Sequence, residues 1–139
     1  MPLPENIRLE VVTPEGLLLR DQVDEVIAPG SDGYFGVRPG HTPMLASLGA
    51  GSITFRKGAV TGFLTCFWGF CEVLPDRVNV LAEIGERAAD IDVSRAEQAK
   101  TQAEARLKHL KDEAGYEEAH KAYIRAVTRL SVAARQRQP

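Results

Sequence analysis

The sequence predicts an α+β fold, in which an N-terminal antiparallel β-sandwich is followed by a C-terminal antiparallel two-helix hairpin. Residues 1–87 hold most of the glycines, prolines and aromatic residues and resemble short strands with frequent turns. Residues 88–139 are rich in alanine at helical spacing. The net charge changes at the same place, from −4 in residues 1–87 to +2 in residues 88–139. We therefore expect two units, 1–87 and 88–139.

The strands of the first unit are marked by alternating apolar and polar residues and by turn residues between them. We expect Pro29-Gly30 to stop one strand and Lys57-Gly58 to form a hairpin turn. Gly69, inside an apolar stretch, indicates a bulge or a close backbone contact. The predicted strands are Ile7–Val11, Gln22–Ala28, Ser52–Arg56, Ala59–Cys66, Thr65–Leu74 and Val78–Ala82.

Two helices are predicted in the second unit, over Val93–Ala114 and Tyr116–Arg135. Asp92 is placed to cap the first helix, and Gly115 is placed to end it. Their apolar stripes consist of Val93, Ala96, Ala99, Ala103, Leu107, Leu110 and Ala114 in the first helix and Ala119, Ala122, Ala126, Leu130 and Ala133 in the second. A seam of alanines buries little surface while alanine favours the helix itself, so the hairpin is either switchable or permanently docked through close alanine packing.

A basic stripe follows Glu118, after which no acidic residue occurs. Lys121, Arg125 and Arg129 are spaced by four residues and lie on one helical face. This stripe is either a solvated face or a surface for an acidic or phosphate-bearing partner. The absence of interleaved aromatic residues and the overall charge of −2 argue against nucleic acid.

Composition and motifs exclude several classes. The chain has 139 residues, 44% hydrophobic and 26% charged, and no apolar run near the ~20 residues that span a bilayer. The N-terminal residues do not resemble a secretory signal. Cys66 and Cys71 lack the partners of a zinc site and are expected to be buried thiols in a reduced compartment. No nucleophile motif or phosphate loop accompanies His41, so we expect no enzyme and no metal.

Several segments resemble the epsilon subunit of the F-type ATP synthase, as found in bacteria. They are Val12–Gly16, Gly36–Pro43, which contains Gly-His-Thr-Pro, and Val78–Glu83. Ile91-Asp92-Val93-Ser94-Arg95-Ala96 is similar to the family's Ile/Leu-Asp-x-x-Arg-Ala motif. The resemblance covers essentially the whole chain.

The resemblance implies a non-catalytic subunit at the cytoplasmic face of the bacterial inner membrane, held there only through its complex. Its sandwich would sit on the central stalk and contact the gamma subunit and the c-ring. Ser31, Asp32, Gly33 and Tyr34 match the family's loop that faces the c-ring, and His41 matches a position near gamma.

The resemblance also implies a regulatory hairpin. In the family the hairpin extends into the head of alpha and beta subunits and inhibits ATP hydrolysis, its basic residues facing an acidic segment of beta; Lys121, Arg125 and Arg129 match this role.

In some members the folded hairpin binds ATP as a regulatory ligand rather than a required cofactor. The matching positions are Glu86, Ile91, Asp92, Arg95, Ala96, Arg125 and Arg129, while a further basic position of some members is Gln102 here. Asp92 and Arg95 are also explained by helix capping alone, so both interpretations stay open. The alternatives to an epsilon subunit are a free-standing ligand-binding module and an adaptor of another complex.

Overall fold

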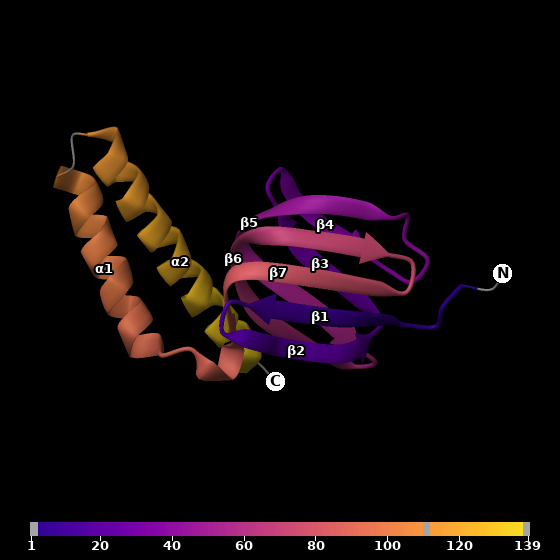
Figure 1. Ribbon diagram of the computed structural model, residues 1–139. Helices are drawn as coiled ribbons and strands as arrows, with labels where there is room; N and C mark the ends of the chain where they lie inside the picture. Colours follow the sequence, from indigo (N-terminus) through magenta and orange to yellow (C-terminus); the bar gives the residue numbers. More distant parts are fainter. Residues whose placement is uncertain (1–2, 110–111, 138–139) are drawn as a thin grey trace.

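The computed structural model describes residues 3–109 and 112–137 and contains a β-sandwich and two long helices (Figure 1). The α+β fold class is therefore confirmed. The helices are α1 (Val93–His109) and α2 (Glu113–Arg137), preceded by a 3-10 turn, η1 (Ala88–Asp90). The strands are β1 (Ile7–Thr13), β2 (Gly16–Val23), β3 (Glu25–Gly30), β4 (Gly33–Val37), β5 (Met44–Lys57), β6 (Val60–Leu74) and β7 (Arg77–Arg87).

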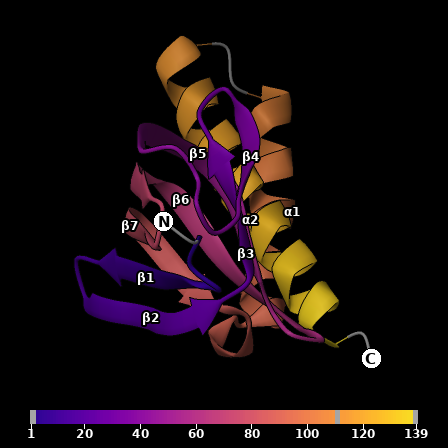
Figure 2. The ribbon, with the colours of Figure 1, turned by 90° about the vertical axis from the view of Figure 1, so that its right-hand side faces the viewer.

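The seven strands form one sheet in the order β2-β1-β7-β6-β5-β3-β4, which folds over into two layers (Figures 1 and 2). Five of the six strand pairs are antiparallel, as predicted, and β1 pairs with β7 in parallel, which was not predicted. The segment that leads into β1 lies at the end of the sandwich away from the helices (Figure 1).

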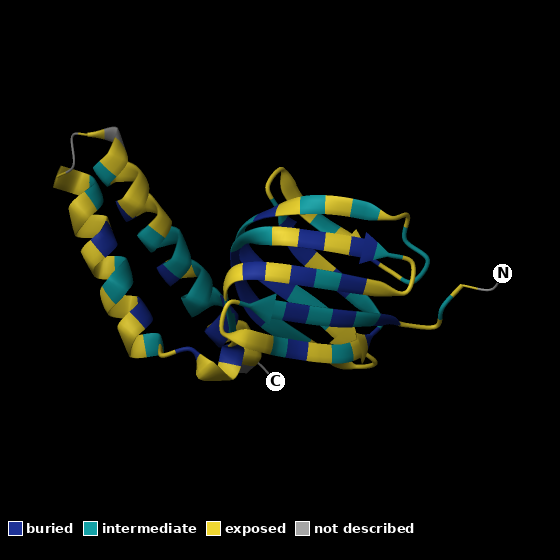
Figure 3. Cartoon of the chain, in the orientation of Figure 1, coloured by how far each residue is buried: buried dark blue, intermediate teal, exposed yellow. Residues whose placement is uncertain are grey.

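The core lies between the layers, where buried residues alternate with accessible ones along β1 and much of β7, whereas β5 and β6 each contain a run of consecutive buried residues (Figure 3). In β1 the side chains of Ile7, Leu9 and Val11 are fully buried, and those between them are partly accessible. This alternation matches the half-buried strand expected there.

The prediction of one strand over Gln22–Ala28 was wrong, because this segment spans two strands. Val23 pairs with Ile7 of β1, whereas Glu25 pairs with Arg56 of β5, so the chain crosses between layers at Asp24. The Asp24 carboxylate fixes this crossing by accepting a hydrogen bond of 2.7 Å from the Gly58 backbone N–H.

Pro29-Gly30 does not stop that strand but continues β3 into a hairpin with β4. Pro29 is tolerated because the pairing of β3 with β5 is irregular between Ile27 and Gly30. Tyr34, expected in a loop, lies in β4. Only the last two residues of β2, Gln22 and Val23, fell within a predicted strand, and β4 was not predicted.

Gly69 confirms the expected close backbone contact. Its φ is +133°, and a Cβ there would collide with the carbonyl oxygen of Leu81 on β7. The preceding Trp68 has φ +62°, and the registers of β6 with β5 and with β7 step over it, from Phe67 to Gly69. Gly49 of β5 and Glu83 of β7 are skipped opposite Trp68, so the register is the same on both sides of it and the distortion adds no residue to β6.

The antiparallel hairpin forms, but its break differs from the prediction. Asp112 caps α2, since its carboxylate accepts from the Gly115 N–H at 2.6 Å. Gly115 thus lies in the first turn of α2 and does not end α1, and Ala114 is exposed. A side-chain cap close to the start of a long alanine-rich helix outweighs the helix-breaking preference of one glycine.

Asp92 caps α1 as predicted, accepting from the Arg95 N–H at 3.0 Å. Ala96, Ala103, Ala119, Ala126 and Ala133 are buried, so the alanine stripes are the packed faces; Leu110 lies outside the described residues. Among the described residues, no helix has the length and hydropathy of a membrane span.

Candidate functional site

A cavity of about 300 Å³ lies where the hairpin meets the sandwich. The sheet contributes the end of β7, the connection contributes η1, and both helices contribute side chains. The lining residues are Glu86, Asp90, Asp92, Arg95, Ala96, Ala99 and Arg129. Three acidic and two basic side chains thus surround a space that exists only while the hairpin is docked.

Arg129 links α2 to the sheet inside this cavity. Its Nε donates to Glu86 Oε1 at 2.7 Å, and the Thr65 hydroxyl donates to the same oxygen at 3.1 Å. Thr65 is fully buried, while the Arg129 and Glu86 side chains are 25% and 28% exposed. Glu86 therefore holds the Arg129 guanidinium at the cavity wall while leaving the pair accessible to water and ligand.

The first turn of α1 forms the opposite wall. The Asp92 carboxylate accepts from the Arg95 N–H, and its carbonyl oxygen accepts from the Ala96 N–H at 3.0 Å. Because one carboxylate oxygen makes the capping bond, capping and ligand contact by Asp92 are compatible. Ala96 is 3% exposed and has a small side chain, so the cavity wall here lies close to the helix backbone.

Five of the seven residues predicted to bind nucleotide line this cavity: Glu86, Asp92, Arg95, Ala96 and Arg129. Ile91 instead packs in a small apolar cluster with Ala88 and Val132, and Arg125 lies over Trp68. Asp90 and Ala99 were missed as lining residues. Ala99 follows Ala96 by three residues on the same helical face, a spacing that would have found it.

The basic stripe lies along the sandwich in this structure, with Lys121 exposed and Arg125 and Arg129 half-buried. Lys121 and Arg125 both lie over the Trp68 ring, and Arg129 lies over Phe67. In the docked hairpin these three side chains are thus neither a fully solvated face nor fully buried. The expectation that they sit beside the apolar face is consistent with this packing.

The residues predicted to contact a rotor lie around the β3–β4 hairpin. Ser31 and Asp32 are exposed at its turn, and Gly33, also exposed, begins β4. The hydroxyls of Ser31 and Ser47 are 2.8 Å apart. Tyr34 is 60% exposed, and its hydroxyl accepts from the Ser52 N–H at 3.1 Å.

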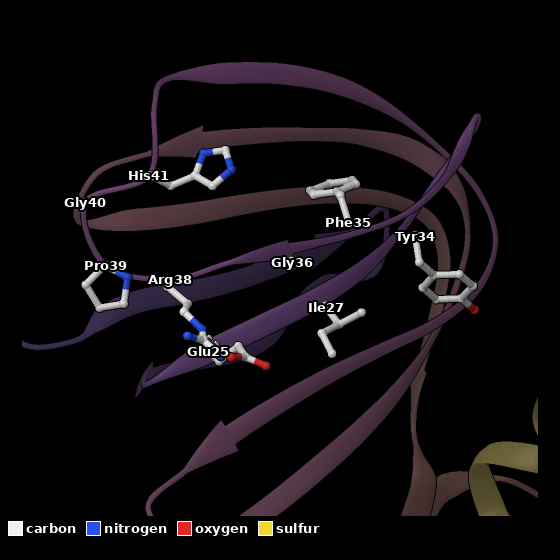
Figure 4. A pocket seen from close by; sticks show the side chains of 9 residues that line it. All are labelled: Glu25, Ile27, Tyr34, Phe35, Gly36, Arg38, Pro39, Gly40 and His41. Carbon is white, nitrogen blue, oxygen red and sulfur yellow. Dashed lines mark hydrogen bonds and ion pairs between the residues drawn. The ribbon is translucent and has the colours of Figure 1, made fainter.

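Tyr34 and His41 line a second cavity, of about 530 Å³, beside this hairpin (Figure 4). His41 Nδ1 is 2.6 Å from the Thr42 carbonyl oxygen. Glu25 and Arg38 form an ion pair of 2.7 Å on the cavity's side, where Figure 4 shows them together. The cavity thus combines an aromatic ring, a histidine and a charge pair on one accessible surface.

An exposed apolar row crosses four strands on the outer face of the sandwich. The cross-strand pairs are Leu17 with Val12, Val12 with Leu81, and Leu81 with Phe70. Leu17, Leu81 and Phe70 are 53%, 60% and 65% exposed. Such a row indicates a surface that another protein covers. Sequence analysis missed it, although the unbroken apolar run Val80–Ala82 departs from alternation and signals it.

The two cysteines are buried free thiols, as predicted from their apolar surroundings. Burial raises the pKa of the Cys66 thiol and of the Cys71 thiol to about 12. Among residues 3–109 and 112–137, no group of three or more His, Cys, Asp or Glu could hold a metal ion.

Comparisons with protein-family models match nearly the whole chain. Residues 6–88 match the model described as "ATP synthase, Delta/Epsilon chain, beta-sandwich domain". Residues 89–134 match "ATP synthase, Delta/Epsilon chain, long alpha-helix domain".

Curated relatives align with this chain over nearly its full length. A protein of Syntrophobacter fumaroxidans named "ATP synthase epsilon chain" is 45% identical over 131 residues, which is 94% of this chain and 98% of that one. A protein of the same name from Nitratidesulfovibrio vulgaris is 43% identical over 130 residues, covering 94% and 97% of the two chains.

Solved structures share the fold. A chain of the Euglena gracilis mitochondrial ATP synthase, from a structure of its OSCP, F1 and c-ring, superimposes with a TM-score of 0.82 at 20% identity, covering 96% of this chain and 84% of that one. A chain from the central stalk and c-ring of the Tetrahymena thermophila enzyme gives a TM-score of 0.65 at 14% identity, covering 96% and 99%.

Proposed function

The chain belongs to the ATP synthase delta/epsilon chain family, among its bacterial epsilon chains, and from this premise we propose that it joins the rotor to the catalytic head and controls ATP hydrolysis through its hairpin. As an epsilon chain it is a non-catalytic subunit of the ATP synthase. In the proposal, residues 1–87 bind the rotor and residues 88–139 regulate, at the cytoplasmic face of the membrane.

The proposed rotor contacts are the gamma subunit and the c-ring. The exposed row of Leu17, Leu81 and Phe70 supplies an apolar surface for a protein partner. Ser31, Asp32, Gly33, Tyr34 and His41 lie around one hairpin, where they are available to contact the rotor. The paired strands β3 and β4, which hold this turn and lead into the loop of His41, form a scaffold suited to transmitting torque.

The docked hairpin is proposed to bind ATP in the 300 Å³ cavity. The observation that carries this proposal is the meeting of Glu86, Asp92, Arg95 and Arg129 from three separate segments. Guanidinium groups pair with phosphate oxygens, and carboxylates accept from amino or hydroxyl groups of a nucleoside. Because the cavity needs both hairpin and sheet, a ligand bound there stabilises the docked state.

The released hairpin is proposed to be the inhibitor. Lys121, Arg125 and Arg129 are occupied by the sandwich while α2 is docked, so they reach an acidic segment of a beta subunit only after release. ATP and the beta subunit then bias the same equilibrium in opposite directions.

The first experiment measures ATP hydrolysis by an epsilon-free assembly of alpha, beta and gamma subunits, with full-length protein or with a version ending at Ala89. We expect inhibition by the full-length protein alone, while both versions bind. If both versions bind and neither inhibits, the proposed inhibition by the hairpin is ruled out and the proposed coupling to the rotor remains. Failure of both to bind would favour a free-standing ligand-binding module.

A second experiment replaces Lys121, Arg125 and Arg129 together by alanine in the same assay. This variant loses contacts that hold the hairpin down, so the hairpin is released more easily. We nevertheless expect weaker inhibition, because the beta-facing charges are gone. Undiminished inhibition would show that the stripe does not contact beta.

A further inference from the structure

Four basic side chains of α2 lie over aromatic rings of one strand, β6. The distances from cation to ring centroid are 5.3 Å for Lys121 and 5.8 Å for Arg125 over Trp68, 5.2 Å for Arg129 over Phe67, and 5.9 Å for Arg135 over Phe63. All four lie within the roughly 6 Å range of a cation–π interaction. Of these rings Trp68 receives two cations, and tryptophan binds cations best.

The positive φ angles of Trp68 and Gly69 explain how Trp68 reaches this position. In a regular strand, neighbouring residues point to opposite faces, so Phe67 and Trp68 would not both face the same helix. Here Trp68 has φ +62° and is followed by Gly69 at +133°, and cations of α2 lie over both rings. The ring centroids of Phe67 and Trp68 are only 6.2 Å apart. The local distortion therefore turns the indole under α2.

The apolar contacts between the hairpin and the sandwich lie elsewhere on α2. They involve Val132 and Ala133 near the C-terminal end of the helix, together with Phe63 and Ile91. Lys121 and Arg125 lie two to three turns before that cluster. The contact with Trp68 is thus a separate attachment point along the helix.

We propose that Trp68 is a latch for the regulatory hairpin, binding Lys121 and Arg125 on its indole face and withholding both cations from an acidic partner until α2 leaves. This rests on the proposed function in taking the hairpin to move, but the latch itself acts within the isolated chain. An acidic partner has to compete with the indole for these cations, so docking and partner binding oppose each other.

The test is amide hydrogen exchange of the full-length chain, followed by mass spectrometry of peptides from α2. Undocking removes the packing of α2 against the sandwich, so α2 amides exchange faster whenever the hairpin leaves it. We expect Trp68→Leu to speed this exchange about fivefold to thirtyfold, as one to two cation–π contacts would require. The double variant Lys121→Met/Arg125→Met should have a similar effect, and combining it with Trp68→Leu should add little.

The matched control is Lys108→Met, which removes one positive charge from the exposed face of α1 and should leave α2 exchange unchanged. Peptides from β7 in the same digest show whether the sandwich stays intact. Unchanged α2 exchange in Trp68→Leu, with β7 protected, would overturn the latch. Faster exchange in Trp68→Leu but not in Lys121→Met/Arg125→Met would overturn the role of the cations.

These outcomes are separate from those of the hydrolysis assay. If the chain does not inhibit ATP hydrolysis but shows the exchange pattern above, the latch is supported and the proposed inhibition is ruled out. If the chain inhibits but Trp68→Leu does not change α2 exchange, the proposed inhibition is supported and the latch is ruled out.

Discussion

Gly69 is the residue whose identity the fold most constrains. Two separate effects act on it: its φ of +133°, and the collision of any Cβ with the Leu81 carbonyl oxygen. We expect Gly69→Ala to lower the free energy of unfolding by at least about 2 kcal/mol, measured by urea denaturation.

Gly16→Ala is the matched comparison. Gly16 has φ +127°, but nothing lies within 4 Å of the position that a Cβ would take, so this variant carries backbone strain without the collision. It should cost clearly less than Gly69→Ala. Equal losses in the two variants would mean that strain alone, and not close packing of β6 on β7, fixes Gly69.

The thiols of Cys66 and Cys71 supply a prediction about pH. Burial raises the pKa of each from 9.0 to about 12. Below pH 9 the thiol stays protonated in both the folded and the unfolded state, so stability is unaffected. Above pH 9 the unfolded chain loses the proton first, so the free energy of unfolding falls from about pH 9 towards pH 12.

A thiol reagent at about pH 8 should label neither cysteine until urea unfolds the chain. Rapid labelling of the folded chain would contradict this.

Among the elements, those with regular periods were predictable. The alternation of Ile7–Val11 and the alanine spacing of α1 were sufficient, because burial on one face imposes the pattern directly. The edge strands β2 and β4 were harder to find, since each has few buried residues and its pairing comes from partners distant in sequence. The break between α1 and α2 depended on one hydrogen bond to Asp112, which competes with the preference of Gly115.

At the start of α1, capping and ligand binding by Asp92 can be separated by two substitutions. Asp92→Ser keeps a capping oxygen and should retain the melting temperature, while losing most of the stabilisation by millimolar ATP. Asp92→Ala removes the cap as well, at a cost of about 1 kcal/mol in the free energy of unfolding. Thermal unfolding with and without ATP measures both. A full ATP response in Asp92→Ser would exclude its carboxylate from the site.

For the molecule as a whole, the two-part architecture was predictable because composition and charge both change near residue 87. Five of the predicted nucleotide-site residues converge, since they lie at the junction that the motif around Asp92 marks. The placement of Arg125 over Trp68 was not predictable, because it depends on positive φ angles at Trp68 and Gly69 that turn one side chain against strand alternation. The parallel pairing of β1 with β7 likewise has no local signal.

The docked hairpin covers an aromatic surface of the sandwich. Truncation at Ala89 removes α2 from above Phe63, Phe67 and Trp68. We expect the truncated chain to bind an apolar dye such as ANS more strongly than the full chain does, while its far-ultraviolet circular dichroism keeps the strand signal. Equal dye binding would mean that the hairpin shields little of this surface.

The parallel pairing of β1 with β7 sets an order of events during synthesis. Arg8 pairs with Arg77, so β1, the first strand to be synthesised, keeps one edge unpaired until β7, the last strand, has been made. At about 5–20 residues per second, the 69-residue separation corresponds to roughly 3–14 s. Until then β1 has only β2 beside it, and α1 and α2 are synthesised later still.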